Sequence, residues 1–193
     1  METSIKNPIP LTSKLLALAI LGSLTLSCSD QATDATQALN ARITEQADRM
    51  NTLTERLSVL EAREEIRALI LDYGWAHDHR DYRAYADLFA ENGEWVSGMG
   101  TAMGPEAIFA FLDDAIGHNP LPEGSGTFHI MSNEQIDVDG DRASAVTKWV
   151  YVTRNPDDTP LFTFIGHYYD EFIRENGAWK FLRRESVREI PAG

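Results

Sequence analysis

The chain has 193 residues, 43% of them hydrophobic and 24% charged, which is enough for one domain with a core plus additional segments. The chain has 17 Lys and Arg residues and 30 Asp and Glu residues, which gives a formal net charge of −13. An acidic surface repels phosphate backbones, so the composition argues against nucleic acid as a partner. The single cysteine excludes an intramolecular disulfide and a cysteine-based metal site.

The first residues have the features of a bacterial export signal. Two lysines precede an apolar run at residues 15–21, which is too short to span a bilayer comfortably but suits a signal-peptide core. The sequence Leu-Thr-Leu-Ser-Cys at residues 24–28 resembles a lipobox, whose cysteine becomes the lipidated first residue of a mature lipoprotein. We expect a lipoprotein signal peptide over residues 1–27 and lipidation at Cys28. The alternative is an ordinary cleaved signal with an incidental cysteine.

This interpretation predicts an exported protein that is anchored to the membrane through Cys28 and faces the periplasm. Ser29 follows the cysteine, whereas Asp at that position favours inner-membrane retention in the enterobacterial sorting pattern, so we expect an outer-membrane location. Residues 28–38 are mostly Ser, Thr, Gln, Ala and Asp without periodic apolar positions, which predicts a flexible tether.

A helical arm is expected over residues 39–62, where apolar residues recur at three- and four-residue steps. Leu53, Leu57 and Leu60 mark a narrow stripe that could form a short coiled coil or pack on the folded domain. Gln46 occupies one position of this seam. We expect a homo-oligomer, either a dimer or a trimer.

The remainder, residues 63–193, is predicted to be one α+β domain. Pro105 suits the first position of a helix, and Asn176-Gly177 is a strong hairpin signal. The order is three helices with one early strand and then an antiparallel meander, which indicates a curved antiparallel sheet with helices enclosing a pocket. We expect helices at residues 64–79, 82–90 and 105–116, and strands at residues 94–97, 127–138, 142–153, 161–174 and 179–187.

Five short motifs occur along this domain: Asp-His-Arg-Asp-Tyr at 78–82, Gly-Pro-Glu-Ala at 104–107, Thr-Phe-His at 127–129, Val-Asp-Gly-Asp-Arg-Ala at 138–143 and Asn-Gly-Ala-Trp-Lys-Phe at 176–181. In this order and spacing they resemble the SnoaL-like branch of the nuclear-transport-factor-2-like superfamily, over residues 64–185. The resemblance implies a cone-shaped, cystatin-like fold with an interior pocket. Within the branch, the chain looks most like scytalone dehydratase, γ-hexachlorocyclohexane dehydrochlorinase and bile acid 7α-dehydratase.

The resemblance also implies catalytic residues. The Asp–His dyad of those enzymes corresponds to Asp78 and His129, and the tyrosine of the bile acid enzyme corresponds to Tyr73. An imidazole is a usable base near neutral pH, and a carboxylate that accepts its Nδ1–H fixes the tautomer and stabilises the imidazolium. The Tyr73 hydroxyl could donate to a leaving hydroxyl or to a carbonyl. The second pocket histidine of scytalone dehydratase has no counterpart, which implies a different substrate.

Plainer roles for these residues remain open. Asp78 could cap the turn between two helices or pair with Arg80 or Arg83, and His129 could be a satisfied core histidine. His77 and His79 lie two residues apart on a helix and point in different directions, so neither a metal site nor a cofactor is expected.

The expected pocket is lined by large side chains from the strands. Strand alternation allows only one of Tyr168 and Tyr169 to face inward, and Tyr168 is favoured. Arg174, Arg183 and Arg184 could supply a guanidinium for an anion or could be plain surface. The expected substrate-binding residues are Trp95, Met131, Asn133, Trp149 and Tyr168.

Three functions follow from these patterns. The first is a cofactor-independent lyase or isomerase that acts on a hydrophobic cyclic molecule, either dehydratase-like or dehydrohalogenase-like. The second is a non-catalytic envelope protein that binds a small ligand or a partner through the same cavity. The third is a purely structural lipoprotein, for which an inward-facing carboxylate and imidazole would serve no purpose.

Overall fold

The structure is a computed structural model that describes the backbone of residues 12–117 and 126–191, and side chains from residue 31 onward. The beginning of the predicted signal peptide and the Cys28 side chain lie outside the described residues, as does most of the loop expected before the first long strand. Among the described helices, none has a stretch that is both apolar enough and long enough to cross a bilayer.

One long helix, α1 (Thr12–Asp78), occupies the first part of the chain. It includes residues 28–38, where we expected a tether. This segment contains Ala and Gln and neither Gly nor Pro, so nothing in it interrupts a helix. The hydroxyl of Thr36 donates to the carbonyl of Ala32, one turn earlier. Side chains from residue 31 to residue 58 are all exposed.

The chain divides into two compact units between Glu55 and Arg56, so the second unit begins before the Arg63 that we expected. In the second unit, α1 buries one face, because Ile66, Ile70 and Tyr73 recur at helical spacing and are at most 3% exposed. This face contacts the sheet: the ring of Tyr73 lies 5.5 Å from that of Tyr168.

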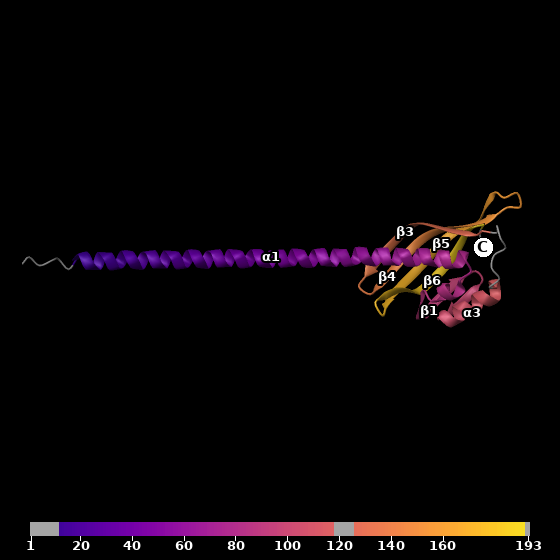
Figure 1. The fold of residues 1–193 in the computed structure, drawn as a ribbon, viewed down its shortest axis with the longest axis horizontal. Helices are drawn as coiled ribbons and strands as arrows, with labels where there is room; N and C mark the ends of the chain where they lie inside the picture. Colours follow the sequence, from indigo (N-terminus) through magenta and orange to yellow (C-terminus); the bar gives the residue numbers. More distant parts are fainter. Residues whose placement is uncertain (1–11, 118–125, 192–193) are drawn as a thin grey trace, which may run out of the picture. The chain divides into compact units, whose positions relative to one another are not determined.

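The remaining elements of the second unit are two short helices and six strands (Figure 1). The expected α+β class is confirmed, since the four long strands follow one another in an antiparallel meander. The helices are α2 (Tyr82–Ala86) and α3 (Pro105–Ile116), and the strands are β1 (Phe89–Ser97), β2 (Gly100–Met103), β3 (Phe128–Asp139), β4 (Arg142–Arg154), β5 (Pro160–Glu175) and β6 (Ala178–Ile190).

The strand order in the sheet is β2-β1-β6-β5-β4-β3. Two details differ from the sequence-based expectation: β2 lies between the expected strand at residues 94–97 and the expected helix at residues 105–116, where no strand was expected, and β1 pairs with β6 in parallel. The second helix ends at Ala86 and not at residue 90, because Phe89 pairs with Phe181 of β6. Pairing of this kind joins distant residues and is invisible to local helix propensity.

The sheet bends because its strands carry bulges. Register shifts occur in β3 between Ser132 and Gln135, in the β4–β5 pair at Tyr151, and in the β5–β6 pair at two places. A bulge adds a residue to one strand and increases its bend and twist. In β4, buried and exposed residues largely alternate, as in a sheet with one face on the core. The covered face is therefore concave and leaves room for a cavity.

Candidate active site

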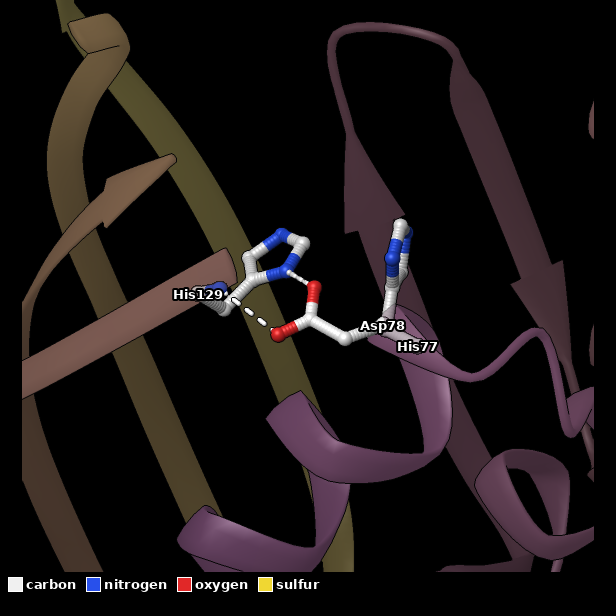
Figure 2. A group of neighbouring side chains, drawn as sticks. All are labelled: His77, Asp78 and His129. Atoms are coloured by element: carbon white, nitrogen blue, oxygen red, sulfur yellow. Dashed lines mark hydrogen bonds and ion pairs between the residues drawn. The ribbon is translucent and has the colours of Figure 1, made fainter. Parts of the chain in front are cut away.

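Asp78 and His129 meet where the end of α1 approaches the start of β3 (Figure 2). The Nδ1 atom of His129 lies 2.7 Å from Oδ1 of Asp78. The backbone N–H of His129 donates to Oδ2 of the same carboxylate at 2.8 Å. Because a carboxylate only accepts hydrogen bonds, Nδ1 carries the proton and Nε2 carries the lone pair in the neutral ring.

Two of the plainer roles for Asp78, capping α2 and pairing with Arg83, are filled by other residues. The cap of α2 is Asp81, whose Oδ1 accepts from the backbone N–H of Ala84 at 3.0 Å. Arg83 makes two hydrogen bonds to Glu106 on α3. The Asp78 carboxylate is therefore directed at His129, with side-chain exposures of 15% and 8% respectively.

A cavity of about 510 Å³ borders the His129 ring, whose Nε2 has no hydrogen-bond partner among the described residues. A volume of this order suits a small organic ligand, and aromatic side chains dominate the wall. The lining residues include Tyr73, His77, Tyr85, Trp95, Trp149, Tyr151, Phe164 and Tyr168.

Tyr73 lies on this wall with its hydroxyl already held in place. The hydroxyl accepts from Tyr85 Oη and, at 3.3 Å, from Trp95 Nε1. Burial raises the pKa of Tyr73, so the phenol keeps its proton at neutral pH. Since both neighbours act as donors, the proton of Tyr73 remains available to a molecule in the cavity.

The structure places Trp95, Trp149 and Tyr168 on the cavity wall, while Tyr169 is 42% exposed. The expectation fails for the other two predicted binding residues, Met131 and Asn133, because neither lines the cavity. Asn133 is exposed in the β3 bulge with a φ of 56°, because the extra residue there ends the alternation that began at His129. The end of Met131 packs over Gly74 of α1.

His77 is the residue that sequence reasoning missed. It lines the cavity, and its ring centroid lies 4.4 Å from that of His129 (Figure 2). Burial, reinforced by the neighbouring His129, lowers the pKa of His77 to about 3. Its Nδ1 atom is buried and has no hydrogen-bond partner among the described residues. The four-residue step from Tyr73 was the available signal, because it places both side chains on one helix face.

His77, Asp78 and His129 offer ligand atoms that lie within 4.8 Å of one another. The expectation of no metal considered His77 with His79, whereas His79 instead stacks on Trp75. Two imidazoles and a carboxylate are a donor set that suits several divalent metals. Here the carboxylate and the His129 ring are bonded to each other, and a shared cation would have to replace that bond.

A second ionic pair lies beneath the cavity wall. Arg184 is fully buried and makes two 2.7 Å hydrogen bonds to Asp170. Its guanidinium carbon lies 4.0 Å from the centre of the Tyr73 ring and 4.2 Å from that of Tyr168. Arg184 is therefore not a surface residue, unlike Arg174, which pairs with Glu65 at an exposed site.

Comparison with known proteins assigns this chain to a family. The SnoaL-like domain matches residues 58–185, which is most of the chain. The chain belongs to the SnoaL-like domain family. This membership, together with the cavity, makes it a small-molecule pocket protein. No curated protein sequence matches the chain significantly.

Solved structures of the same architecture agree with the assignment to the SnoaL-like family. A nuclear-transport-factor-2-like protein with a cystatin-like fold from Novosphingobium aromaticivorans is 34% identical, with a TM-score of 0.63 over 70% of this chain and 87% of that chain. A candidate scytalone dehydratase from the same organism is 26% identical, with a TM-score of 0.54 over 67% of this chain and 85% of that one.

A hexachlorocyclohexane dehydrochlorinase, LinA type 2, is 23% identical, with a TM-score of 0.56 over 68% of this chain and 88% of that chain. At this level of identity, the likeness shows a shared fold alone. These comparisons support the expected cone-shaped, cystatin-like architecture.

Proposed function

We propose that the protein is a cofactor-independent lyase or isomerase in which His129 is the general base. The observation that carries this proposal is the 2.7 Å contact between Nδ1 of His129 and Asp78, with Nε2 left unbonded on a ring that borders the cavity. The carboxylate orients the imidazole and stabilises the cation that forms when Nε2 takes a proton.

The reaction begins when Nε2 of His129 removes a proton from a carbon next to an electron-withdrawing group. The C–H electron pair becomes a double bond. In a lyase, the bond to a β-leaving group breaks; a departing hydroxide takes up a proton and leaves as water, whereas a halide leaves as the anion. In an isomerase, the proton returns at another carbon. In this proposal the hydroxyl of Tyr73, a residue that lines the cavity, donates a hydrogen bond to the departing group.

The substrate class follows from the cavity wall. Seven large aromatic side chains from α1, α2, β1, β4 and β5 border about 510 Å³, which suits a hydrophobic cyclic molecule. They are Tyr73, Tyr85, Trp95, Trp149, Tyr151, Phe164 and Tyr168.

The test starts from compounds that co-purify with the protein from native membranes, identified by mass spectrometry. Turnover of these compounds is then compared among the wild type, His129→Ala and His167→Ala. His167 is a matched control, because it also contacts a carboxylate, Glu189, at 2.5 Å but does not line the cavity. We expect His129→Ala to lose about 10²–10⁴-fold in turnover and His167→Ala to lose none.

Equal turnover by the wild type and His129→Ala would remove His129 from the mechanism. Equal binding of the compounds by both proteins, with no turnover by either, would support the alternative function of a ligand-binding envelope module.

We also propose that the mature protein is a lipoprotein anchored at Cys28 in the outer membrane and facing the periplasm. The support is the lipobox-like sequence at residues 24–28, which contains the only cysteine of the chain. Metabolic labelling with a fatty-acid analogue should mark the wild type and not Cys28→Ser, and membrane fractionation should release the variant. Labelling that persists in Cys28→Ser would contradict the anchor.

A further inference from the structure

The two cavity imidazoles have contrasting surroundings. His129 donates to the Asp78 carboxylate from both its ring and its backbone N–H, whereas no hydrogen bond between His77 and that carboxylate is found among the described residues. The rings are inclined at 61° to each other with centroids 4.4 Å apart, and both border the cavity. One small substrate group could therefore touch both rings at once.

His77 stays uncharged throughout the neutral range, because burial opposes the charged form of its ring. A neutral imidazole has one N–H donor and one lone pair, and it can polarise a carbonyl without giving up a full proton. A satisfied core histidine would have both ring nitrogens bonded, whereas Nδ1 of His77 is buried without a partner.

We propose that His77 is a second catalytic group, whose neutral ring donates a hydrogen bond to the substrate oxygen that gains charge while His129 removes the proton. This inference rests on the proposed function and names its substrate class: a cyclic compound with a carbonyl next to the acidic C–H. The C–H electron pair forms the new C=C bond, the carbonyl π pair moves to oxygen, and His77 stabilises that oxyanion. No redox partner is needed.

The experiment follows hydrogen–deuterium exchange at the carbon next to the carbonyl, by NMR, in the full chain with a panel of aromatic-fused cyclic ketones. The variants are His77→Phe, which removes the donor, and His77→Gln, which restores an N–H. We expect His77→Phe to lose about 10²-fold or more in exchange rate and His77→Gln to recover part of it. His167→Ala is the control, and quenching of tryptophan fluorescence by the ketones reports binding.

The readouts separate this inference from the proposed function. Exchange that depends on His129 but is the same in His77→Phe and the wild type would overturn the role of His77 alone. Elimination from substrates without a carbonyl, with no ketone exchange, would overturn the substrate class and leave His129 as the base. Activity that requires added Zn²⁺ and disappears with a chelator would replace the hydrogen-bonding role with a metal site.

A second inference concerns the exposed stripe of α1, which we define as Leu39, Ile43, Gln46, Met50, Leu53, Leu57 and Leu60. The six apolar members are each more than half exposed. The steps between successive members alternate between four and three residues, which is the a/d repeat of a coiled coil. An exposed apolar seam of this kind is stabilised when a matching helix covers it.

The charges beside the stripe select the matching helix and its direction. The positions just before Ile43, Met50 and Leu57 are all arginine: Arg42, Arg49 and Arg56. These are g positions, which face each other in an antiparallel pair and would set arginine against arginine. In a parallel pair, a g residue faces the e residue five positions later in the partner, so Arg56 faces the partner's Glu61.

We infer that the stripe binds the same stripe of a second copy in a parallel, in-register coiled coil. Light scattering of the full chain should give an oligomer that the double variant Leu53→Glu, Leu57→Glu reduces to a monomer. The matched control Asn51→Glu, Ser58→Glu changes positions outside the seam and should remain assembled.

Orientation is tested with Leu39→Cys in a Cys28→Ser background, where it is the only thiol. A parallel, in-register pair places residue 39 opposite residue 39 of the partner, so mild oxidation should give a covalent dimer. A monomeric full chain would overturn the inference. So would cross-linking that occurs only when Leu39→Cys is mixed with Leu57→Cys, because a d position faces an a position in an antiparallel pair.

Discussion

Two carboxylates near the cavity, Asp170 and Asp78, each hold a basic side chain, and the two pairs differ in what they leave available. Asp170 and Arg184 have no exposed side-chain surface and share two hydrogen bonds. Asp78 and His129 are partly exposed, and the ring of His129 borders the cavity. The members of the first pair are buried and bonded to each other, whereas in the second pair Nε2 of His129 has no hydrogen-bond partner among the described residues.

The two basic side chains, Arg184 and His129, also differ in how readily they change charge. Burial alone would lower the pKa of Arg184, but Asp170 raises it above its ordinary value, so Arg184 never loses its proton. An imidazole gains and loses a proton near neutral pH. A carboxylate that holds an arginine can only stabilise structure, whereas one that holds an imidazole can also assist the chemistry proposed for this site.

The largest expected effect comes from breaking the pair formed by Asp170 and Arg184. Asp170→Ala leaves the Arg184 guanidinium buried without its carboxylate, and the free energy of unfolding should fall by about 3–5 kcal/mol. Urea denaturation followed by tryptophan fluorescence measures this loss. The control is the double variant Asp170→Leu, Arg184→Met, which removes both charges and should recover most of the stability. A loss of less than about 1 kcal/mol in Asp170→Ala would show that the pair contributes little.

Changing the pair formed by Asp78 and His129 should affect activity more than stability. Asp78→Asn keeps the shape of the side chain but weakens the bond from the His129 backbone, so the unfolding free energy should fall by only about 1–2 kcal/mol. Turnover should fall by about 10²–10⁴-fold, because the imidazolium loses its carboxylate. Parallel unfolding and kinetic measurements test this, and the comparison fails if stability falls as far as in Asp170→Ala.

Acid should destabilise the domain through His77. Its pKa is lowered to about 3 in the folded state, whereas an unfolded histidine titrates near its model value of 6.5. Between these values the unfolded chain binds more protons, so stability falls as the pH drops from about 6.5 toward 3, by at most about 1.4 kcal/mol per pH unit.

His77→Gln removes this titration, so the difference in unfolding free energy between wild type and variant should change with pH across that window. Urea unfolding at several pH values between 7 and 4 measures it. A constant difference would mean that His77 is not held neutral by burial.

The smallest expected effect is at Gly74, where α1 passes close to β3. A Cβ there would lie 2.7 Å from Cε of Met131 and 3.5 Å from Cβ of His129. Alanine favours the helix by about 1 kcal/mol, and the flexible end of Met131 can move aside at a similar cost. We expect Gly74→Ala to change stability by less than about 1 kcal/mol, as measured by thermal unfolding. A larger loss would mean that Met131 has no room to move.

Much of the fold could be predicted because its signals are local. Asn176 and Gly177 both adopt positive φ, as the hairpin signal requires, and Pro105 begins α3 as expected. The errors involve non-local pairing. Strand β2 has only four residues and is defined by its pairing with β1, and the parallel contact between β1 and β6 joins residues far apart in sequence.

The candidate site was predictable to the extent that family motifs mark it. Those motifs pointed to Asp78 and His129. Alternation predicted that only one of Tyr168 and Tyr169 faces inward, and the favoured Tyr168 is the buried one. A bulge in β3 turned Asn133 outward, and no residue type announces a bulge at that position. His77 was missed because its importance depends on burial and on an imidazole from a distant strand, which sequence spacing does not show.

The single carboxylate of Asp78 holds both the main chain and the ring of His129, two attachments that span 51 positions of the chain. The proposed general base therefore exists only in the folded protein, because a nascent or denatured chain does not hold His129 in a hydrogen bond to Asp78. Recovery of activity during refolding should coincide with docking of the last turn of α1 against the sheet. Activity would then report when this part of the native structure has formed.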